Sequence, residues 1–148
     1  MIRPFCPNDT AAVLDVWLAA SLAGHGFLPA AYWRARLTDV RDHYLPLSET
    51  IVFVDDDSGA VVAFASLIGS FLAGLFVSPA HWGRGIGRRL LELAVRMHPD
   101  LDVVIYAQND RALRFYARNG FVRYSTRLEE STGCTEYCLQ YDPAARER

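Results

Sequence analysis

The sequence predicts one α/β domain with three layers, in which helices flank a mixed sheet. Short apolar runs of strand length alternate along the chain with longer segments of helical periodicity. One strand, helix and strand unit, from residue 71 to residue 106, forms a crossover whose two strands should be parallel. The chain has 148 residues, 51% of them hydrophobic, and no linker or low-complexity segment, so it can bury a single core.

The first fifty residues predict a short strand followed by two helices. Residues 2–5 form the strand, and Asn8 can cap the first helix. A second helix begins near Pro29 and carries charged residues on its other faces. The apolar side of the first helix has Val13, Leu14, Trp17 and Leu18, and that of the second has Trp33, Leu37, Val40 and Tyr44.

Residues 51–68 predict two paired strands joined by an acidic turn. An apolar run over residues 51–54 precedes the polar segment Asp55–Gly59, and Val61–Ile68 pairs back on it. Because consecutive side chains point in different directions, we interpret the three aspartates as a solvated turn and expect no metal site.

The segment 60–77 is eighteen residues long and has no charge, which reaches the lower limit for a membrane span. Gly69 and Ser70 divide it into two pieces of strand length. We therefore expect two buried strands, the second over Phe71–Val77, and no membrane partner.

The second half of the chain predicts two helices and three strands. Pro99 ends the first of these helices, Asn109 caps the second, and Gly120 gives it a left-handed stop. The helices cover Ile86–Met97 and Asp110–Arg118, and the strands cover residues 101–106, 122–128 and 134–141.

A glycine-rich turn between an apolar strand and an amphipathic helix is typical of a phosphate site. Glycine lets the backbone turn tightly and approach a ligand, and the helix start offers free N–H groups. Cations are unfavourable at such a start unless an anion compensates them. A solvated basic face is the alternative. The glycines are Gly83, Gly85 and Gly87, and the cations are Arg84, Arg88 and Arg89.

Two common phosphate motifs fit this turn poorly. A Walker loop needs a lysine, and the chain has fifteen arginines and no lysine. A dinucleotide fold needs G-x-G-x-x-G and an acidic residue after the next strand. Here the spacing is G-x-G-x-G, and Asp100 and Asp102 lie before or at that strand, so this interpretation is weak.

The segment from Val77 to Leu90, with Asn109 and residues 114–121, resembles the acetyl-coenzyme A site of the GNAT N-acetyltransferases. In that family the motif Q/R-x-x-G-x-G/A opens the helix that cradles the coenzyme A pyrophosphate. Trp82 stands where glutamine or arginine is usual. The chain is similar to small single-domain bacterial members, including protein-lysine acetyltransferases. The resemblance implies one domain over residues 1–148, a mostly antiparallel mixed sheet and acetyl-coenzyme A as co-substrate.

The resemblance also implies which residues contact acetyl-coenzyme A. Tyr116 matches a tyrosine beside the sulfur, where a protonated phenol can act as general acid for the leaving thiolate. Asn109 matches an asparagine that bonds the pantetheine arm. The alternatives are a packed tyrosine and an ordinary helix cap. The expected cofactor-binding set is the main chain of Leu75, Phe76 and Val77 together with Trp82, Gly83, Arg84, Gly85, Ile86, Gly87, Arg88, Asn109 and Tyr116.

On the acceptor side the resemblance implies His25, Phe27 and Phe71. The carboxylate usual on the strand is missing, because residues 70–76 contain no acid. His25 is then the best candidate for a general base, since it titrates in the useful range and lies between two glycines. The alternatives are a structural histidine, proton loss through water and, for Phe71, a core position.

Together these features predict an enzyme that transfers acetyl from acetyl-coenzyme A to a primary amine by direct attack. The acceptor is a protein lysine, an N-terminus or a small amine. Two alternatives stay open at this point. One is a non-catalytic acetyl-coenzyme A binding or sensing module, and the other is a toxin-like acetyltransferase acting on aminoacyl-tRNA.

Charge and cysteine content bound the partners and the compartment. The formal net charge of −2 argues against a nucleic-acid partner. Cys6, Cys134 and Cys138 lack metal-ligand spacing, and no secretory segment precedes Asn8, so we expect a cytoplasmic protein with reduced thiols. We expect a monomer or a homodimer.

Overall fold

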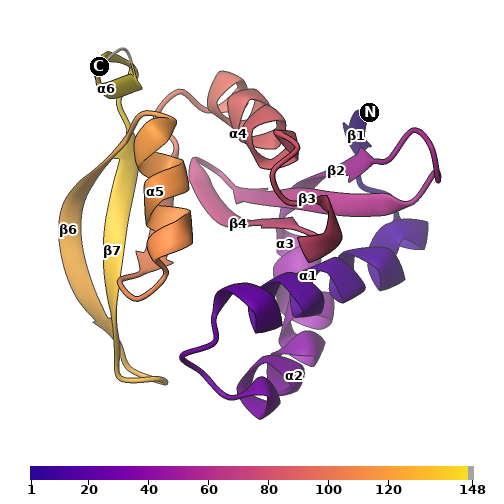
Figure 1. Ribbon diagram of the computed structural model, residues 1–148, viewed down its shortest axis with the longest axis horizontal. Coiled ribbons are helices and arrows are strands. Elements are labelled where there is room, and N and C mark those ends of the chain that lie inside the picture. Colours follow the sequence, from indigo (N-terminus) through magenta and orange to yellow (C-terminus); the bar gives the residue numbers. More distant parts are fainter. Residues whose placement is uncertain (147–148) are drawn as a thin grey trace.

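The computed structural model describes residues 1–146 and shows one seven-stranded sheet with helices on both faces (Figure 1). The strands are β1 (Ile2–Pro4), β2 (Glu49–Val54), β3 (Val61–Ile68), β4 (Phe71–Val77), β5 (Asp102–Tyr106), β6 (Phe121–Glu129) and β7 (Cys134–Tyr141). Their order is β1-β2-β3-β4-β5-β7-β6, and the β4–β5 pair is parallel while the other five pairs are antiparallel. The mixed, mostly antiparallel sheet predicted from the sequence is confirmed.

Two pairs of helices cover opposite faces of this sheet (Figure 1). Helices α1 (Thr10–Gly24) and α2 (Ala30–Asp39) pack on one face, and α4 (Ile86–Met97) and α5 (Asp110–Arg118) pack on the other. The shorter helical elements are η1 (Pro7–Asp9), η2 (Val40–Tyr44), α3 (Leu45–Leu47), η3 (Pro79–His81) and α6 (Pro143–Arg146). The three predicted layers are therefore present.

Strand alternation divides the buried side chains between two cores. Leu72 and Leu90 belong to the core beneath α4 and α5. Trp17 and Phe64 belong to the core beneath α1 and α2. Because successive residues of a strand point to opposite faces, each strand next to the site supplies side chains to both layers.

The second predicted helix is interrupted before its apolar stripe ends. Helix α2 stops at Asp39, and η2 follows it as one wide turn of π-helix. A π-turn adds a residue to the helical turn and so shifts the positions that face inward. Val40 and Leu45 are buried, whereas Tyr44 is 51% exposed. The prediction that Tyr44 continues the stripe is therefore wrong.

The uncharged segment 60–77 forms two strands, as predicted. It supplies β3 and β4, and Gly69 takes the tight turn between them with a φ of +58°. In the part of the chain that the structure describes, no helix has the length and apolar character needed to cross a membrane.

Strands β4 and β5 separate soon after they meet. They pair only at Phe71 with Asp102 and at Leu72 with Val103. The register of β4 against β3 shifts at the next residue, Ala73, and such a bulge bends a strand. Beyond it β4 stays with β3, while β5 continues alongside β7. The sheet is consequently open at the carboxyl ends of its two parallel strands.

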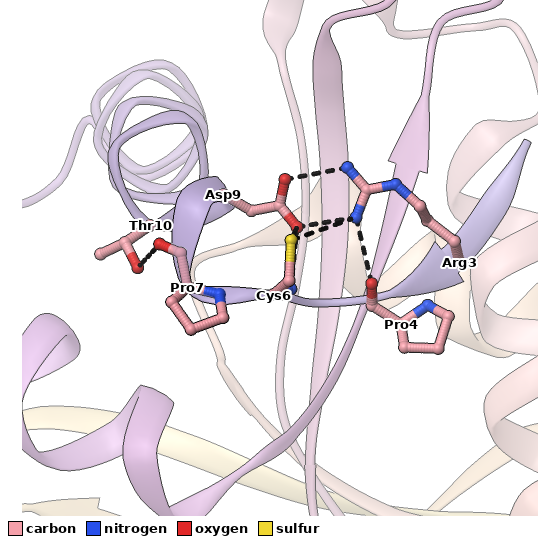
Figure 2. Close-up of polar contacts among 6 residues, drawn as sticks. All are labelled: Arg3, Pro4, Cys6, Pro7, Asp9 and Thr10. Carbon is pink, nitrogen blue, oxygen red and sulfur yellow. Dashed lines mark hydrogen bonds and ion pairs between the residues drawn. The ribbon is translucent and has the colours of Figure 1, made fainter.

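The first helix is anchored by a carboxylate, and not by Asn8 as predicted. Figure 2 shows that the Arg3 guanidinium donates two hydrogen bonds to the Asp9 carboxylate, at 2.8 and 2.9 Å, and that Asp9 Oδ2 also accepts the Cys6 N–H, at 2.9 Å. Arg3 lies on β1, and Asp9 directly precedes α1. These bonds hold the pKa of Asp9 well below its usual range. They fix α1, which reaches the functional site, against the edge of the sheet.

We expect Asp9→Asn to lower the free energy of unfolding by about 1 to 3 kcal/mol at neutral pH, because it weakens the charge-assisted hydrogen bonds to Arg3 and Cys6. Because the folded-state pKa of Asp9 is depressed, its stabilisation is complete above its ordinary value of 3.8 and is lost as the pH falls further. Denaturant unfolding should therefore show the two proteins converging below about pH 4. Asp57→Asn, in the exposed turn, is the control, and an equal loss in this variant would contradict the assignment.

Candidate active site

A cavity of about 750 Å³ lies where β4 and β5 separate, a volume typical of small-molecule sites. Its lining comes from both faces of the sheet. Residues of the glycine turn and of α5, including Tyr116, line it from one face. Ala20, His25 and Trp33 line it from the face covered by α1 and α2. Two reactants can therefore approach one point from opposite sides of the sheet.

The glycine turn has the backbone geometry of an anion cradle. Gly83 and Gly85 have φ values of +80° and +78°, which side chains other than glycine rarely adopt. Gly85 directly precedes α4, and no side chain caps the first turn of that helix. A Cβ on Gly87 would lie 3.4 Å from the Phe115 ring. These residues fit a pyrophosphate, because the uncapped N–H groups and the helix dipole favour negative charge.

Three arginines surround the same side of the cavity. Arg88 from α4 and Arg111 and Arg118 from α5 are among the lining residues. Arg88 also lies 3.5 Å from Glu92, one helical turn later. Burial, and then the charge of Arg118, lower the pKa of Arg111. The positive charge at this mouth favours an anionic ligand.

Trp82 holds the turn to the end of β4. Its Nε1–H donates to the Val77 carbonyl oxygen at 2.7 Å. The Arg111 guanidinium lies over the indole ring, 3.5 Å from the ring centroid, as in a cation–π contact. Trp82 therefore holds the Arg111 guanidinium of α5 beside the position where the motif usually has glutamine or arginine.

Strand pairing decides which main-chain groups of β4 face the cavity. The Ser78 N–H donates to the Val62 carbonyl of β3, at 2.8 Å. Because antiparallel pairs alternate, Phe76 also pairs with β3, whereas Leu75 and Val77 direct their N–H and C=O groups away from β3. Of the three residues predicted to offer main-chain groups, the geometry leaves Leu75 and Val77. Phe76 lines the cavity without such groups to offer.

Tyr116 is a buried wall of the cavity on the α5 side. It is 4% exposed, and its ring contacts those of Phe115 and Phe121. Burial raises the pKa of Tyr116. Its phenol is therefore protonated at neutral pH, in the form a proton donor requires.

Asn109 and His25 form one hydrogen-bonded unit. Asn109 caps α5, and its Oδ1 accepts the Ala112 N–H at 3.2 Å, so the cap considered from the sequence is confirmed. This bond orients the amide so that Nδ2 faces His25 Nε2, at 3.0 Å. As Nδ2 can only donate, the lone pair of Nε2 is occupied. Burial also lowers the pKa of His25 to about 4. Both observations favour a positioning role for His25 over that of a base.

Three residues expected at the site lie outside the cavity lining. Arg84 is exposed on the outer side of the glycine turn. Phe27 packs its ring against His25 and Tyr106, with 5.7 and 5.3 Å between ring centroids. His25 and Tyr106 line the cavity, whereas Phe27 does not. Phe71 begins β4 at the closed end of the gap and is 37% exposed, neither in the core nor in the cavity. Every other residue in the expected set lines the cavity.

The sequence reasoning missed Glu136 and Arg111. Glu136 lies on β7, is 8% exposed and lines the cavity. A carboxylate within the apolar alternation of residues 134–141, two positions before the buried Cys138, was the available signal. Arg111 gave no local signal, because a charged residue in the first turn of an amphipathic helix is usually solvated.

Comparisons with known proteins assign the family. A family described as the acetyltransferase (GNAT) domain matches residues 48–123. The chain is 38% identical over 122 residues to the peptidyl-lysine N-acetyltransferase YiaC of Escherichia coli. The aligned part covers 82% of each of the two chains. The chain belongs to the GNAT family. It is therefore an N-acetyltransferase by type, which favours an enzyme over a non-catalytic module.

Further relatives agree with this GNAT assignment. The peptidyl-lysine N-acetyltransferase YjaB of Escherichia coli is 36% identical over 109 residues, 74% of this chain and 73% of its own. The solution structure of apo YjaB has a TM-score of 0.84 at 29% identity and covers 95% and 96% of the two chains. PaiA from Thermoplasma acidophilum, solved in complex with coenzyme A, shares the fold with a TM-score of 0.78 at 17% identity over 95% and 98%.

We expect Gly85→Glu to reduce the affinity for acetyl-coenzyme A by about 100-fold or more, roughly 3 kcal/mol, because it puts bulk and negative charge into the cradle. Isothermal titration calorimetry measures this. Gly59→Glu is a matched control, since Gly59 also has a positive φ, +72°, and lies in the turn between β2 and β3. If both variants bind equally well, the cradle is not the diphosphate site.

The depressed pKa of His25 predicts a pH dependence of stability. His25 takes up a proton near its ordinary value of 6.5 when unfolded but only near 4 when folded. The unfolded chain therefore binds more protons in this window, and stability falls as the pH drops through it. Thermal unfolding at pH values of about 7 and 5 should show a larger loss for the native protein than for His25→Gln. Equal losses would mean that the imidazole is accessible and protonated in the folded state.

Proposed function

We propose that this GNAT protein transfers the acetyl group of acetyl-coenzyme A to a primary amine by direct attack, with Tyr116 as the general acid. The observation that carries the proposal is the cavity between β4 and β5. One side combines an uncapped helix start, a glycine cradle and three arginines, which suits a diphosphate. The other side opens beneath α1 and α2, where an acceptor can enter.

Direct attack is supported by the chemistry of the lining. Among the described residues that line the cavity there is no serine, threonine, cysteine or lysine. An acyl group is most often carried on an activated serine, cysteine or threonine, so this lining favours direct attack. Holding thioester and amine together instead supplies rate through effective concentration, and such positioning can be worth several powers of ten.

The main-chain groups at the cavity edge can position the thioester. Leu75 and Val77 direct N–H groups away from β3, toward the gap left by β5. A backbone N–H aimed at a carbonyl oxygen stabilises the charge that develops when the carbonyl carbon is attacked. We assign the binding of the thioester carbonyl to the N–H groups of Leu75 and Val77 on β4, on the cavity side that Tyr116 also lines.

Tyr116 is suited to give a proton to the leaving sulfur. A tyrosine phenol is protonated at neutral pH, and the apolar surroundings of Tyr116 disfavour a free thiolate beside it. Transfer of the phenolic proton to sulfur removes the charge from the leaving group. The amine gives up a proton in the same reaction and so restores the phenol.

A lysine side chain of a protein is the first acceptor to test. YiaC and YjaB, the relatives described above, are named peptidyl-lysine N-acetyltransferases. The assay follows free thiol release from acetyl-coenzyme A with N-terminally blocked lysine peptides, peptides with a free N-terminus, small amines and aminoacyl-tRNA. Release that depends on one amine class supports the proposal, and no release with any of them would overturn it.

We expect Tyr116→Phe to lower kcat by roughly 100-fold while leaving the affinity for acetyl-coenzyme A nearly unchanged, because only the proton donor is lost. Tyr124→Phe is the control, since this phenol is exposed and bonded to Asp102 at 2.6 Å. Stopped-flow thiol detection and calorimetry separate the two effects. An unchanged kcat in Tyr116→Phe would remove this residue from the mechanism.

A further inference from the structure

Resting on the proposed function, we propose that Glu136 binds the ammonium group of the acceptor and takes its proton before attack. Glu136 supplies the carboxylate base that β4 lacks, and the acceptor is an amine that arrives protonated. Three features of the described chain carry this role. They are the face of the sheet on which Glu136 lies, its partial pairing and the charges of the cavity.

Strand register places Glu136 on the acceptor face. It stands directly opposite Tyr106 on β5 and opposite Arg127 on β6. Residues paired across antiparallel strands share a face. The Tyr106 ring contacts those of His25 and Trp33, which belong to the α1 and α2 side. Glu136 therefore reaches the cavity from the face opposite the glycine turn and Tyr116.

The carboxylate of Glu136 is buried but only partly paired. Its side chain is 11% exposed, and its Oε1 accepts the Arg127 Nε–H at 3.0 Å. Among residues 1–146, Arg127 is the side chain that bonds this carboxyl, and Arg127 is itself 57% exposed. The hydrogen bond from Arg127 leaves Oε2 available to a donor that enters the cavity. An ammonium group in the cavity would satisfy Oε2.

The charges of the lining have opposite signs at the two sides. Glu136 is the acidic residue among the described lining residues, and it lies on the acceptor face. Arg88, Arg111 and Arg118 come from the helices of the other face. Glu136 therefore attracts a positively charged acceptor to one side of the cavity, and the arginines attract the negative phosphates of the donor to the other side. Tyr106, paired opposite Glu136, and Trp33, whose ring contacts that of Tyr106, add aromatic surface to this side of the lining, which suits an alkylammonium.

The proton balance of the step is complete with these groups. The ammonium R–NH₃⁺ gives one proton to the Glu136 carboxylate and becomes a neutral amine with a free electron pair. That pair forms the C–N bond to the acetyl carbon while the C–S bond breaks. Tyr116 gives its phenolic proton to the leaving sulfur, and the second proton that leaves nitrogen as the amide forms restores the phenol. Glu136 then releases its proton to water.

The test compares two acceptors that differ in protonation. One is an N-terminally blocked peptide with a single lysine. The other is the same peptide with an aminooxy group, which is neutral at neutral pH, in place of the lysine ammonium. We expect Glu136→Gln to lower kcat/KM about 100-fold for the lysine peptide and less than about 5-fold for the aminooxy peptide. Calorimetric affinity for acetyl-coenzyme A should stay unchanged.

Controls separate failure of folding from failure of chemistry. Glu130→Gln removes an exposed charge from the turn between β6 and β7 and should leave both peptides unaffected. Glu136→Asp keeps the charge and should restore part of the lysine activity. Equal losses with both peptides, or no loss with either, would overturn the role of Glu136. If the native protein acetylates no amine at all, the proposed function fails instead.

Discussion

The separation of β4 from β5 is the constraint on which the rest of the structure depends. Parallel neighbours normally satisfy each other's backbone groups, but here pairing stops after Leu72 and Val103. Leu75 and the Val77 N–H then lack a strand partner, whereas the Val77 carbonyl accepts the Trp82 Nε1–H. A polar group left with neither a protein partner nor water costs roughly 1 to 3 kcal/mol. The cavity at this point lets a polar ligand or water satisfy these groups. The opening that a ligand would use is thus a property of the sheet, and helices on both faces supply the rest of its lining.

The parts of the fold that could be predicted from the sequence are those fixed by local chemistry. The glycine turn is one example, since Gly83 and Gly85 take left-handed conformations that other residues avoid. The split of residues 60–77 at Gly69 is another, because two strands bury an uncharged run without a membrane. In both cases the glycines that determine the local backbone lie within the turn that they form.

What could not be predicted depends on partners far away in the chain. His25 and Asn109 are 84 positions apart, and neither local sequence indicates that an amide donor occupies the imidazole. The direction of the Phe76 main chain follows from its pairing with β3, which one strand alone does not reveal. Glu136 faces the cavity only because β7 inserts between β5 and β6. The exposed Tyr44 has a different cause, a π-turn that no apolar stripe signals.

Trp82 shows how a residue distant in the chain can bring a positive charge to the glycine turn. An indole cannot replace the polar side chain usual at the start of the motif, yet its face attracts a cation and its N–H fastens the turn to Val77. Arg111, which follows α4 and β5 in the chain, supplies that cation from α5. The contact ties the turn before α4 to α5, beside the place where Gly87 of α4 lies against the Phe115 ring of α5. In the proposed complex the phosphates would meet a turn and an arginine that already contact each other, so less order has to be gained on binding.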